Sequence, residues 1–424
     1  MPKRSAKWMA VALIVLACLL LSWLQPLGRS RSLQFAMQTD VSLTAWIYSK
    51  PVARLLSDYQ AQHPEVNIEI RIFRSEERLY EELAAAISTH ATPHMAEIGS
   101  GPGLGPLADS GALVPWDAED ASAVEERYAE AFRHDGRLWA LPYGAVLSVL
   151  YYNENLLRRP AGSPAVAGEL TWAQLTEQAM KMTQDVNGDG VTDIWGFVAD
   201  GNAARYLSGA IAAGGGAAAE AEASSGQLFR VWHDLVFRYK AMPALEHHLA
   251  LSSFIDGAAG LLLAPSDIRN MLEEYIGGTF GFGLLPVPLR DRNEAAAVRV
   301  SGLARLRSEP ETELLAGRIA AYLLEPETQR RLFAEASKLP VAAGMLERWM
   351  ENPDAWTERE AELLRIAGGK LRIEASEAMG KTVREQVRLI QEQLEGSAEV
   401  CIPCMAQSYR QALTEGERTG RSGG

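Results

Sequence analysis

The sequence predicts an α/β protein whose largely parallel sheet is covered by helices on both faces. From Val41 onwards, β-rich stretches alternate with helical stretches of about ten to fifteen residues. Parallel strands need such crossover helices, which pack on the two faces of the sheet. The 424 residues are 47% hydrophobic, with 36 glycines and 20 prolines, which is typical of a packed chain. At roughly 100–200 residues per domain, this length predicts two or more lobes.

The first elements follow from local patterns. VSLTAWIY is rich in β-formers, PVARLLSDYQAQHP is amphipathic and stops at a proline, and VNIEIRIF alternates with period two. These patterns predict a strand, a helix and a strand over 41–48, 51–64 and 66–73. A helix over 75–89 and a strand over 93–100 complete the series.

A glycine-rich loop, Gly101 to Gly105, follows the third strand. It lacks the spacing of a dinucleotide fingerprint and the lysine of a P-loop. We therefore interpret it as a tight turn that brings backbone N–H groups to the carboxyl edge of the sheet. Ligands bind at this edge in open α/β sheets.

The rest of the chain continues the pattern. Residues 150–278 hold further helices and a low-complexity insert, 214–226, which is typical of a flexible connection. A return strand over 280–289, a strand over 300–306 and a helical region over 309–336 follow. The tail from about 345 to 415 is predicted to be mostly helical.

The N-terminus predicts export. Lys3, Arg4 and Lys7 precede an uncharged run over 8–24, which is typical of a Sec-type targeting segment. An uncleaved anchor, lipidation at Cys18 in a lipobox-like Val-Leu-Ala-Cys, and ordinary cleavage are the three alternatives. In each, residues 1–39 form a signal or anchor segment with its tether. The remaining chain then lies on the extracytoplasmic face of the cell membrane.

Two other cysteines, Cys401 and Cys404, are spaced C-I-P-C near the C-terminus. Two thiols cannot complete a four-ligand zinc site. A redox C-x-x-C is expected to open a helix within a βαβ unit near the start of a small domain. We therefore predict a local disulfide or two thiols without a role.

Charge and motifs exclude several functions. The net charge of −13 is opposite to the field that a nucleic-acid partner requires. No G-x-S-x-G elbow is present, and the Pro93 between His90 and His94 prevents a shared helical face for the two rings. The Tyr151-Tyr152 pair could bind ferric iron, but it lies in a strand-like run. No catalytic residue and no required cofactor are predicted.

A loop over 185–193 matches part of an EF-hand. Short oxygen side chains stand at positions 1, 3, 5 and 9 and a glycine at position 6, a spacing that can wrap six to eight oxygens around calcium. Position 12 is Gly196, so the bidentate glutamate is absent. The alternative is an Asx-rich turn that satisfies itself. The expected ligands are Asp185, Asn187, Asp189, the carbonyl of Val191 and Asp193.

Taken in order, several stretches resemble the carbohydrate-type extracellular solute-binding proteins of bacterial ABC importers. They are HDGRLWALPYGAVLSVLYYNENLL (134–157), LTWAQLTEQAMKM (170–182), DVNGDGVTDIWGF (185–197), FIDGAAGLLL (254–263), FGFGLLPVP (280–288) and EPETQRRLFAEASKLPV (325–341). The resemblance implies a two-lobe periplasmic-binding-protein-like fold with an interlobe ligand cleft and crossing hinge strands. It places lobe 1 at 40–145 plus 279–338, and lobe 2 at 146–278 plus 339–424.

The resemblance also implies which residues face the cleft. A sugar needs aromatic faces for its C–H patches and polar side chains for its hydroxyls. The candidates stand at the end of the first strand, after the third, before the presumed crossover, and where the family often has Gly-x-Trp. They are Trp46, Tyr48, Ser100, Gly101, Trp139, Tyr143, Ser266 and Asp267. At the last of these positions the chain has Pro265, Ser266 and Asp267 in place of that tryptophan.

The function that follows is capture of a carbohydrate or similar polar solute by a tethered, monomeric, non-enzymatic binding protein. Closure of the two lobes around the ligand would present it to an ABC permease in the membrane. Two alternatives stay open. One is a sensor that reports ligand to a membrane signalling partner, and the other is a secreted carbohydrate-active enzyme, which needs two suitably spaced carboxylates.

Overall fold

The computed structural model describes residues 41–100, 104–157, 170–201, 218–288, 296–373 and 381–421. The predicted export segment with Cys18 and the loop residue Gly101 lie outside these residues. Of the low-complexity insert, residues 218–226 form the start of the helix α10 (Ala218–His233), so this part is not the flexible connection that its composition predicted. None of the described helices is both long and apolar enough to cross a membrane.

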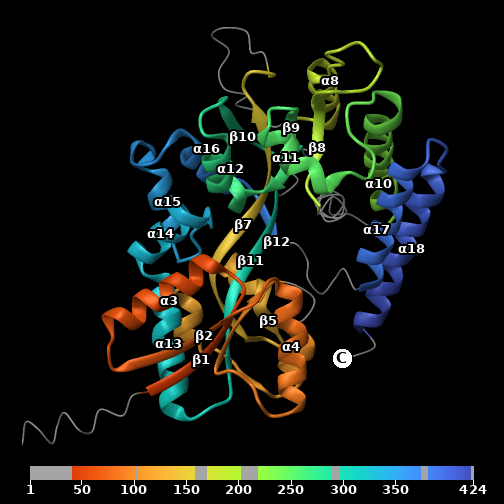
Figure 1. The fold of residues 1–424 in the computed structure, drawn as a ribbon. Helices are drawn as coiled ribbons and strands as arrows, with labels where there is room; N and C mark the ends of the chain where they lie inside the picture. Colours follow the sequence, from red (N-terminus) through yellow and green to blue (C-terminus); the bar gives the residue numbers. More distant parts are fainter. Residues whose placement is uncertain are drawn as a thin grey trace, which may run out of the picture.

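Two lobes share one ten-stranded mixed sheet. In Figure 1, β1, β2, α3, α4 and α13 lie in the lower lobe, here lobe 1, and α8, α10, α11 and α12 in the upper lobe, here lobe 2. The main path of the sheet runs β2-β1-β3-β11-β7-β9-β8. The two-lobe α/β fold is thus confirmed, although the sheet is mixed instead of largely parallel.

Lobe 1 begins as the sequence predicts. Its N-terminal elements are β1 (Val41–Ile47), α3 (Lys50–Gln62), β2 (Val66–Ile72), α4 (Glu76–Ser88), β3 (Met95–Gly99), α5 (Leu104–Asp109) and β4 (Leu113–Val114). β1 pairs in parallel with both β2 and β3. The short α6 (Ala118–Ser122), α7 (Glu126–Ala129), β5 (Arg133–His134) and β6 (Arg137–Leu138) follow.

Two long strands connect the lobes. They are β7 (Ala140–Asn153) and β11 (Ala296–Leu306), which run antiparallel through the middle of the molecule (Figure 1). The first half of β7 pairs with β11, and its second half lies between β9 (Ala259–Pro265) and β10 (Phe282–Pro286). The β7–β11 ladder shifts register between Ser301 and Gly302.

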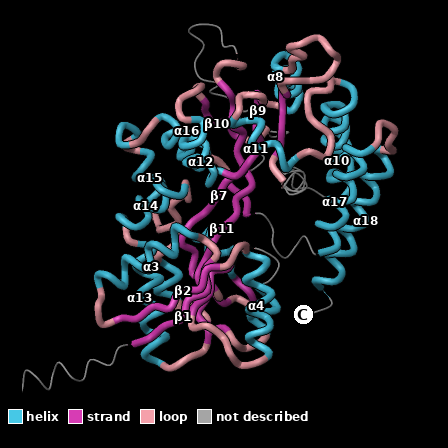
Figure 2. The backbone as a smooth tube through the Cα atoms, in the orientation of Figure 1, coloured by secondary structure: helices cyan, strands magenta, loops and turns pink. Residues whose placement is uncertain are grey.

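Lobe 2 is built on the second half of β7. β9 pairs antiparallel with β7 and parallel with β8 (Trp195–Ala199). Figure 2 shows that helices flank these strands on either side. These helices are α8 (Trp172–Met182), α10 (Ala218–His233), α11 (Ala250–Ile255), α12 (Arg269–Ile276), α16 (Glu358–Ala367), α17 (Lys381–Gly396) and α18 (Ile402–Arg421).

Strand alternation divides the core. On β1, Leu43, Ala45 and Ile47 pack against α3 and α13 (Pro310–Leu324), whereas Trp46 faces the cluster that contains α4. On β7, odd residues from Ala145 to Tyr151 join the α11, α12 and α16 side, and Leu150 and Tyr152 join α8, α10, α17 and α18. Both faces of each lobe's sheet are therefore buried, as expected for crossover helices.

The return to lobe 1 comes later than the predicted boundary at residue 279. β10 pairs with residues Val149 to Asn153 of β7, which places it among the strands of lobe 2. The chain re-enters lobe 1 along β11 and continues into α13 and α14 (Pro326–Ala336). The difference arises because local pattern predicts a strand but not its partner.

A third segment also joins the lobes. After α14, Leu339 exchanges two backbone hydrogen bonds with Ala145 of β7, at 3.2 and 2.8 Å. α15 (Met345–Met350) and α16 follow, and β12 (Leu371–Ile373) pairs with the start of β11. The tail then ends in the α17–α18 hairpin on α10 (Figure 1).

Candidate interlobe site

A buried carboxylate lies where β1 and β3 end. Glu97, in β3, is fully buried and accepts backbone hydrogen bonds from Tyr48 at 2.9 Å and Ser49 at 2.8 Å. The hydroxyl of Tyr143, on β7, donates to its other oxygen. One side chain thus joins the end of β1 to the first half of the crossing strand.

A buried lysine lies beside this carboxylate. Lys338, in the third connecting segment, is 6% exposed, and its Nζ lies 3.3 Å from Ser301 Oγ and 5.5 Å from the centre of the Tyr143 ring. Its stem passes over Gly144, where a Cβ would come within 3.1 Å of it. All three connections between the lobes therefore contribute to one polar cluster, which consists of Glu97, Tyr143, Ser301 and Lys338.

Burial dominates the electrostatics of this cluster. It raises the pKa of Glu97, and the opposing effects of Lys338 and the hydrogen bonds reduce this rise without cancelling it. Burial likewise lowers the pKa of Lys338 against the attraction of Asp267 and Glu97. It also holds the pKa of the Tyr48 hydroxyl well above its usual value, with the charges of Glu97 and Glu76 acting in the same direction. For Glu97 and Lys338, both shifts favour the neutral forms, so the attraction between these two residues offsets only part of the cost of their burial.

The lobe 1 rim is acidic and aromatic. Glu76 opens α4 with its carboxylate against Gly99, so closely that a side chain at Gly99 would overlap it. Tyr80, one turn later, points its hydroxyl at the Gly99 carbonyl, 3.4 Å away. Ser100 donates its backbone N–H to Val300 and accepts the N–H of the same residue on its hydroxyl. Ser100 thus fastens β3 to β11.

An ion pair lies near the polar cluster, between Asp267, which follows β9 of lobe 2, and Arg299 of the connecting strand β11. Asp267 Oδ2 lies 3.8 Å from Arg299 Nη2, and both side chains are about 30% exposed. The preceding Ser266 is fully buried, and its hydroxyl accepts the backbone N–H of Leu147 at 3.2 Å. Ser266 therefore positions the end of β9. Asp267 and Arg299 are the two side chains of this ion pair that solvent can reach.

The register of the strands places the predicted aromatic residues in different parts of lobe 1. Trp46 is 8% exposed and packs against Phe73, with ring centroids 5.2 Å apart, beneath the Arg71 guanidinium. Trp139 directly precedes Ala140, whose partner Ala304 pairs with Ala96 near the start of β3. Its indole donates to the His134 carbonyl at 3.0 Å. Trp139 therefore lies at the opposite end of β3 from Ser100, and Tyr48 and Tyr143 are the aromatic candidates at the junction.

Several residues in or next to the polar cluster were not predicted from the sequence. They are Glu76, Glu97, Arg299, Ser301 and Lys338. Glu97 offered a local signal, since it is a lone carboxylate in the otherwise apolar strand MAEIG. Lys338 lies within the SKLPV stretch but offered no signal, because only the crossing of three remote segments brings it to Glu97.

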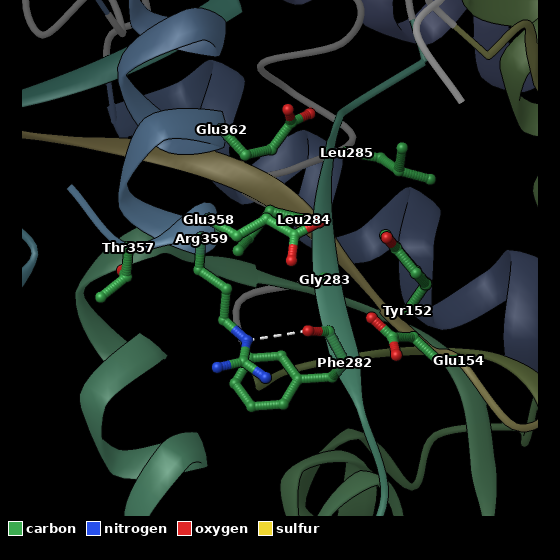
Figure 3. Close-up of a pocket in the computed structure, with 10 residues that line it drawn as sticks. All are labelled: Tyr152, Glu154, Phe282, Gly283, Leu284, Leu285, Thr357, Glu358, Arg359 and Glu362. Atoms are coloured by element: carbon green, nitrogen blue, oxygen red, sulfur yellow. Dashed lines mark hydrogen bonds between the residues drawn. The ribbon is translucent and has the colours of Figure 1, made fainter. Parts of the chain in front are cut away.

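A separate pocket of about 130 Å³ lies in lobe 2, between β10, the end of β7 and the start of α16 (Figure 3). Arg359 Nε donates to the Phe282 carbonyl at 2.8 Å and covers the edge of β10 there. Glu154, Glu358 and Glu362 also line it. No member of the polar cluster is among its lining residues, so the pocket is distinct from the junction.

The 185–193 loop folds back on its own carboxylates. Asp185 accepts the backbone N–H groups of Gly188 and Gly190 at 2.7 and 2.8 Å, and Asp193 accepts those of Val186 and Asn187 at 2.7 and 3.3 Å. Gly188 and Gly190 both have positive φ, which their lack of a side chain permits. This geometry is compatible with the self-satisfied turn and with a weak calcium loop.

Another group of metal-type ligands lies in lobe 1, at the ends of α5 and β5. Asp109, His134 and Asp135 each place one ligand atom within 4.8 Å of the others. His134 Nε2 lies 2.9 Å from Asp109 Oδ1, which an ordinary surface ion pair explains. Both carboxylates are well exposed, and the group lies away from the polar cluster.

A model of bacterial extracellular solute-binding proteins matches residues 54–362, well over half of the chain. The chain belongs to this family. No curated protein matches this solute-binding protein in sequence.

Solved structures share its fold at low identity. A Listeria monocytogenes ABC substrate-binding protein in complex with cycloalternan is 15% identical, with a TM-score of 0.68, over 89% of this chain and 98% of that one. The Bdellovibrio bacteriovorus maltose/maltodextrin-binding domain MalE, bound to maltotriose, is 18% identical, with a TM-score of 0.68, over 89% of this chain and all of that one. A Thermus thermophilus maltotriose binding protein is 16% identical, with a TM-score of 0.67, over 88% and 99%.

Proposed function

We propose that this solute-binding protein captures a carbohydrate between its lobes and delivers it to an ABC permease. The observation that carries the proposal is the Asp267–Arg299 pair, which stays part exposed at the junction where all three connections meet. Charged side chains of this kind make strong hydrogen bonds to sugar hydroxyls. The oligosaccharides bound by the structural neighbours support this ligand class.

The rim of lobe 1 would complete the site. Tyr48 and Tyr80 offer ring faces near Glu76, and Asp267 and Arg299 approach from the other side. A ligand that contacts both sets would favour the closed arrangement over the open one. We further propose that a helix over 8–24, or lipid on Cys18, holds the monomeric protein at the extracytoplasmic face of the membrane.

Isothermal titration with a panel of maltodextrins and other oligosaccharides tests the proposal. We expect binding by at least one sugar, and a loss of about ten-fold or more in affinity for Arg299→Gln and Asp267→Asn, as for hydrogen bonds to charged groups. Glu392→Gln, in a surface ion pair on α17, is the matched control and should bind normally.

Two outcomes would contradict the proposal. The first is the absence of both heat and thermal stabilisation across the panel, since any ligand that binds only the folded chain must stabilise it. The second is release of shortened sugars during incubation, which would indicate the carbohydrate-active enzyme instead.

A further inference from the structure

The two C-terminal cysteines form a disulfide that does not join separate helices or strands. Cys401 and Cys404 are bonded across a sequence separation of 3, at the start of α18. The bond therefore spans a single helical turn and connects no two elements. Because a disulfide stabilises the fold less when the loop that it closes is shorter, this one contributes little to stability.

The surrounding hairpin is held by other contacts. Ile390 and Leu394 of α17 and Met405 and Tyr409 of α18 are buried in one cluster with α10. The Tyr409 ring also meets Phe229 edge-on, with centroids 6.4 Å apart. The position of α18 is therefore fixed by apolar packing on lobe 2, without help from the sulfur atoms.

Both cysteines are exposed, in contrast to the buried residues on the following turn. Exposure matters because thiol–disulfide exchange requires in-line approach of an external sulfur. A disulfide buried beneath the hairpin would have been protected from such an attack.

The two sulfur atoms are not equivalent. Cys401 directly precedes Ile402, the first residue of α18, and its Sγ lies 3.3 Å from the backbone N–H of Cys404, which donates to it. This is the position of a helix N-cap, where an anionic side chain is stabilised by free N–H groups and by the helix dipole. The first turn of α18 contains no acidic residue that would oppose this effect.

Two titratable side chains lie in or near the connection that leads to the pair. Glu399 precedes it in the connection from α17, and His233 of α10 approaches the same connection through the Ser397 carbonyl, 3.2 Å from its Nε2. Neither is an ion-pair partner of a cysteine. The observed contact of the Cys401 sulfur, besides the disulfide, is the one with the first turn of α18.

We propose that Cys401 and Cys404 form a thiol–disulfide exchange site, in which Cys401 is the attacking sulfur and Cys404 the resolving one. In the oxidising direction, the Cys401 thiolate attacks one sulfur of an external disulfide, forms a mixed disulfide and releases the first external thiolate. Cys404 loses its proton to solvent and attacks Cys401 Sγ, which closes the internal disulfide and releases the second thiolate. Two electrons pass from the cysteine pair to the external disulfide, and an external dithiol drives the reverse reaction.

The first test uses the full chain in a Cys18→Ser background, so that only this pair reacts. The chain is equilibrated in glutathione buffers of rising reduced-to-oxidised ratio, quenched with acid and labelled with a heavy maleimide. We expect complete and reversible interconversion of dithiol and disulfide while the circular dichroism stays native. Labelling that occurs only after addition of denaturant would overturn the proposal.

The second test assigns the two roles. Alkylation by iodoacetamide is followed against pH in Cys404→Ser, which leaves Cys401, and in Cys401→Ser, which leaves Cys404. We expect half-maximal alkylation of Cys401 at the lower pH, because the helix N-terminus stabilises its thiolate. Equal or reversed midpoints would refute the assignment.

The double variant Cys401→Ser/Cys404→Ser is the folding control. It should retain the native spectrum and bind the same sugar as the parent chain, which keeps this inference separable from the proposed function. If the double variant does not fold, the bond is a structural staple and the exchange site is refuted.

Discussion

Arg269 Nε donates to Ser337 Oγ at 2.8 Å, which fastens α12 of lobe 2 to the end of α14 of lobe 1. The guanidinium also reaches the Ala334 carbonyl at 3.4 Å and the Glu360 carboxylate at 3.4 Å. Arg269 is 2% exposed. It thus satisfies carbonyl groups at the C-terminus of α14, where a cation is favourable.

Removal of this arginine should be strongly destabilising. Arg269→Ala would leave the buried Glu360 carboxylate without its cationic partner, with only the hydrogen bonds from Thr357, and would free the carbonyls of α14. We expect a loss of about 3–5 kcal/mol in the free energy of unfolding, measured by urea denaturation. Arg365→Ala, which removes an exposed pair with Glu362, is the matched control and should cost less than about 1 kcal/mol. Equal losses in the free energy of unfolding for the two variants would show that the buried contacts of Arg269 add no stability beyond an exposed ion pair.

A half-buried histidine, His247, gives the stability a defined pH dependence. His247 Nδ1 lies 3.0 Å from the Ala199 carbonyl and Nε2 lies 2.7 Å from Glu395 Oε2. Burial alone would lower the pKa of His247, but the hydrogen bond and charge of Glu395, with the Ala199 carbonyl, outweigh it and raise the pKa. The folded state therefore binds the proton more tightly than the unfolded chain. The resulting stabilisation is complete below the unfolded pKa of about 6.5 and is lost as the pH rises through the folded value.

Denaturation series between pH 5.5 and about 9 measure this effect. The free energy of unfolding of the parent chain should fall with rising pH through the titration of His247. His247→Gln should remove that part of the slope, whereas the exposed neighbour variant His248→Gln should keep it. A slope that persists in His247→Gln would mean that other groups carry it.

Gly196 marks a direct contact between α8 and β8. A Cβ at this position would overlap the backbone carbonyl of Ala179. Since the obstacle is backbone, Gly196→Ala must push the helix away, and we expect a loss of about 3 kcal/mol, the upper end of overpacking costs. Gly201→Ala, where no atom of the described residues lies within 4 Å of the added atom, should change stability by less than about 0.5 kcal/mol. Thermal and urea midpoints compare the two.

Calcium should stabilise the chain through the 185–193 loop, as its sequence predicts. If the site fills, calcium at ten times its dissociation constant adds about 1.4 kcal/mol. Asp189→Asn should abolish the increase in melting temperature, and magnesium at the same concentration should not reproduce it, since it demands a tighter octahedral shell. An unchanged melting temperature in calcium and in chelator would leave the loop as a self-satisfied turn.

Local patterns predicted individual elements well. The helices expected over 51–64 and 75–89 are Lys50–Gln62 and Glu76–Ser88, because an initial proline or serine cap and the apolar spacing are local properties. Thr171 and Gln174 likewise form a capping box at the start of α8. The two-lobe arrangement followed from the resemblance and is confirmed.

Long-range pairing was not accessible from the sequence. The pairing of β10 with β7, and the position of Trp139 at the opposite end of β3 from Ser100, both depend on the register of strands that are far apart in the chain. No local pattern encodes this register. The Glu97–Lys338 neighbourhood required the same information. Tyr48, Tyr143 and Asp267, which the sequence named, lie at the junction and stay predicted ligand contacts. Glu97, Arg299 and Lys338, at the same junction, were not predicted.

The register shift at Ser301 and Gly302 has a mechanical consequence. Because β7 belongs to both lobes, any opening of the molecule must be absorbed as torsion along a continuous hydrogen-bonded ribbon, and a bulge is where such a ribbon bends most easily. Ser301 is also the residue that Lys338 contacts. Bending the ribbon at this point would therefore move Ser301 relative to Lys338 and strain the hydrogen bond between them.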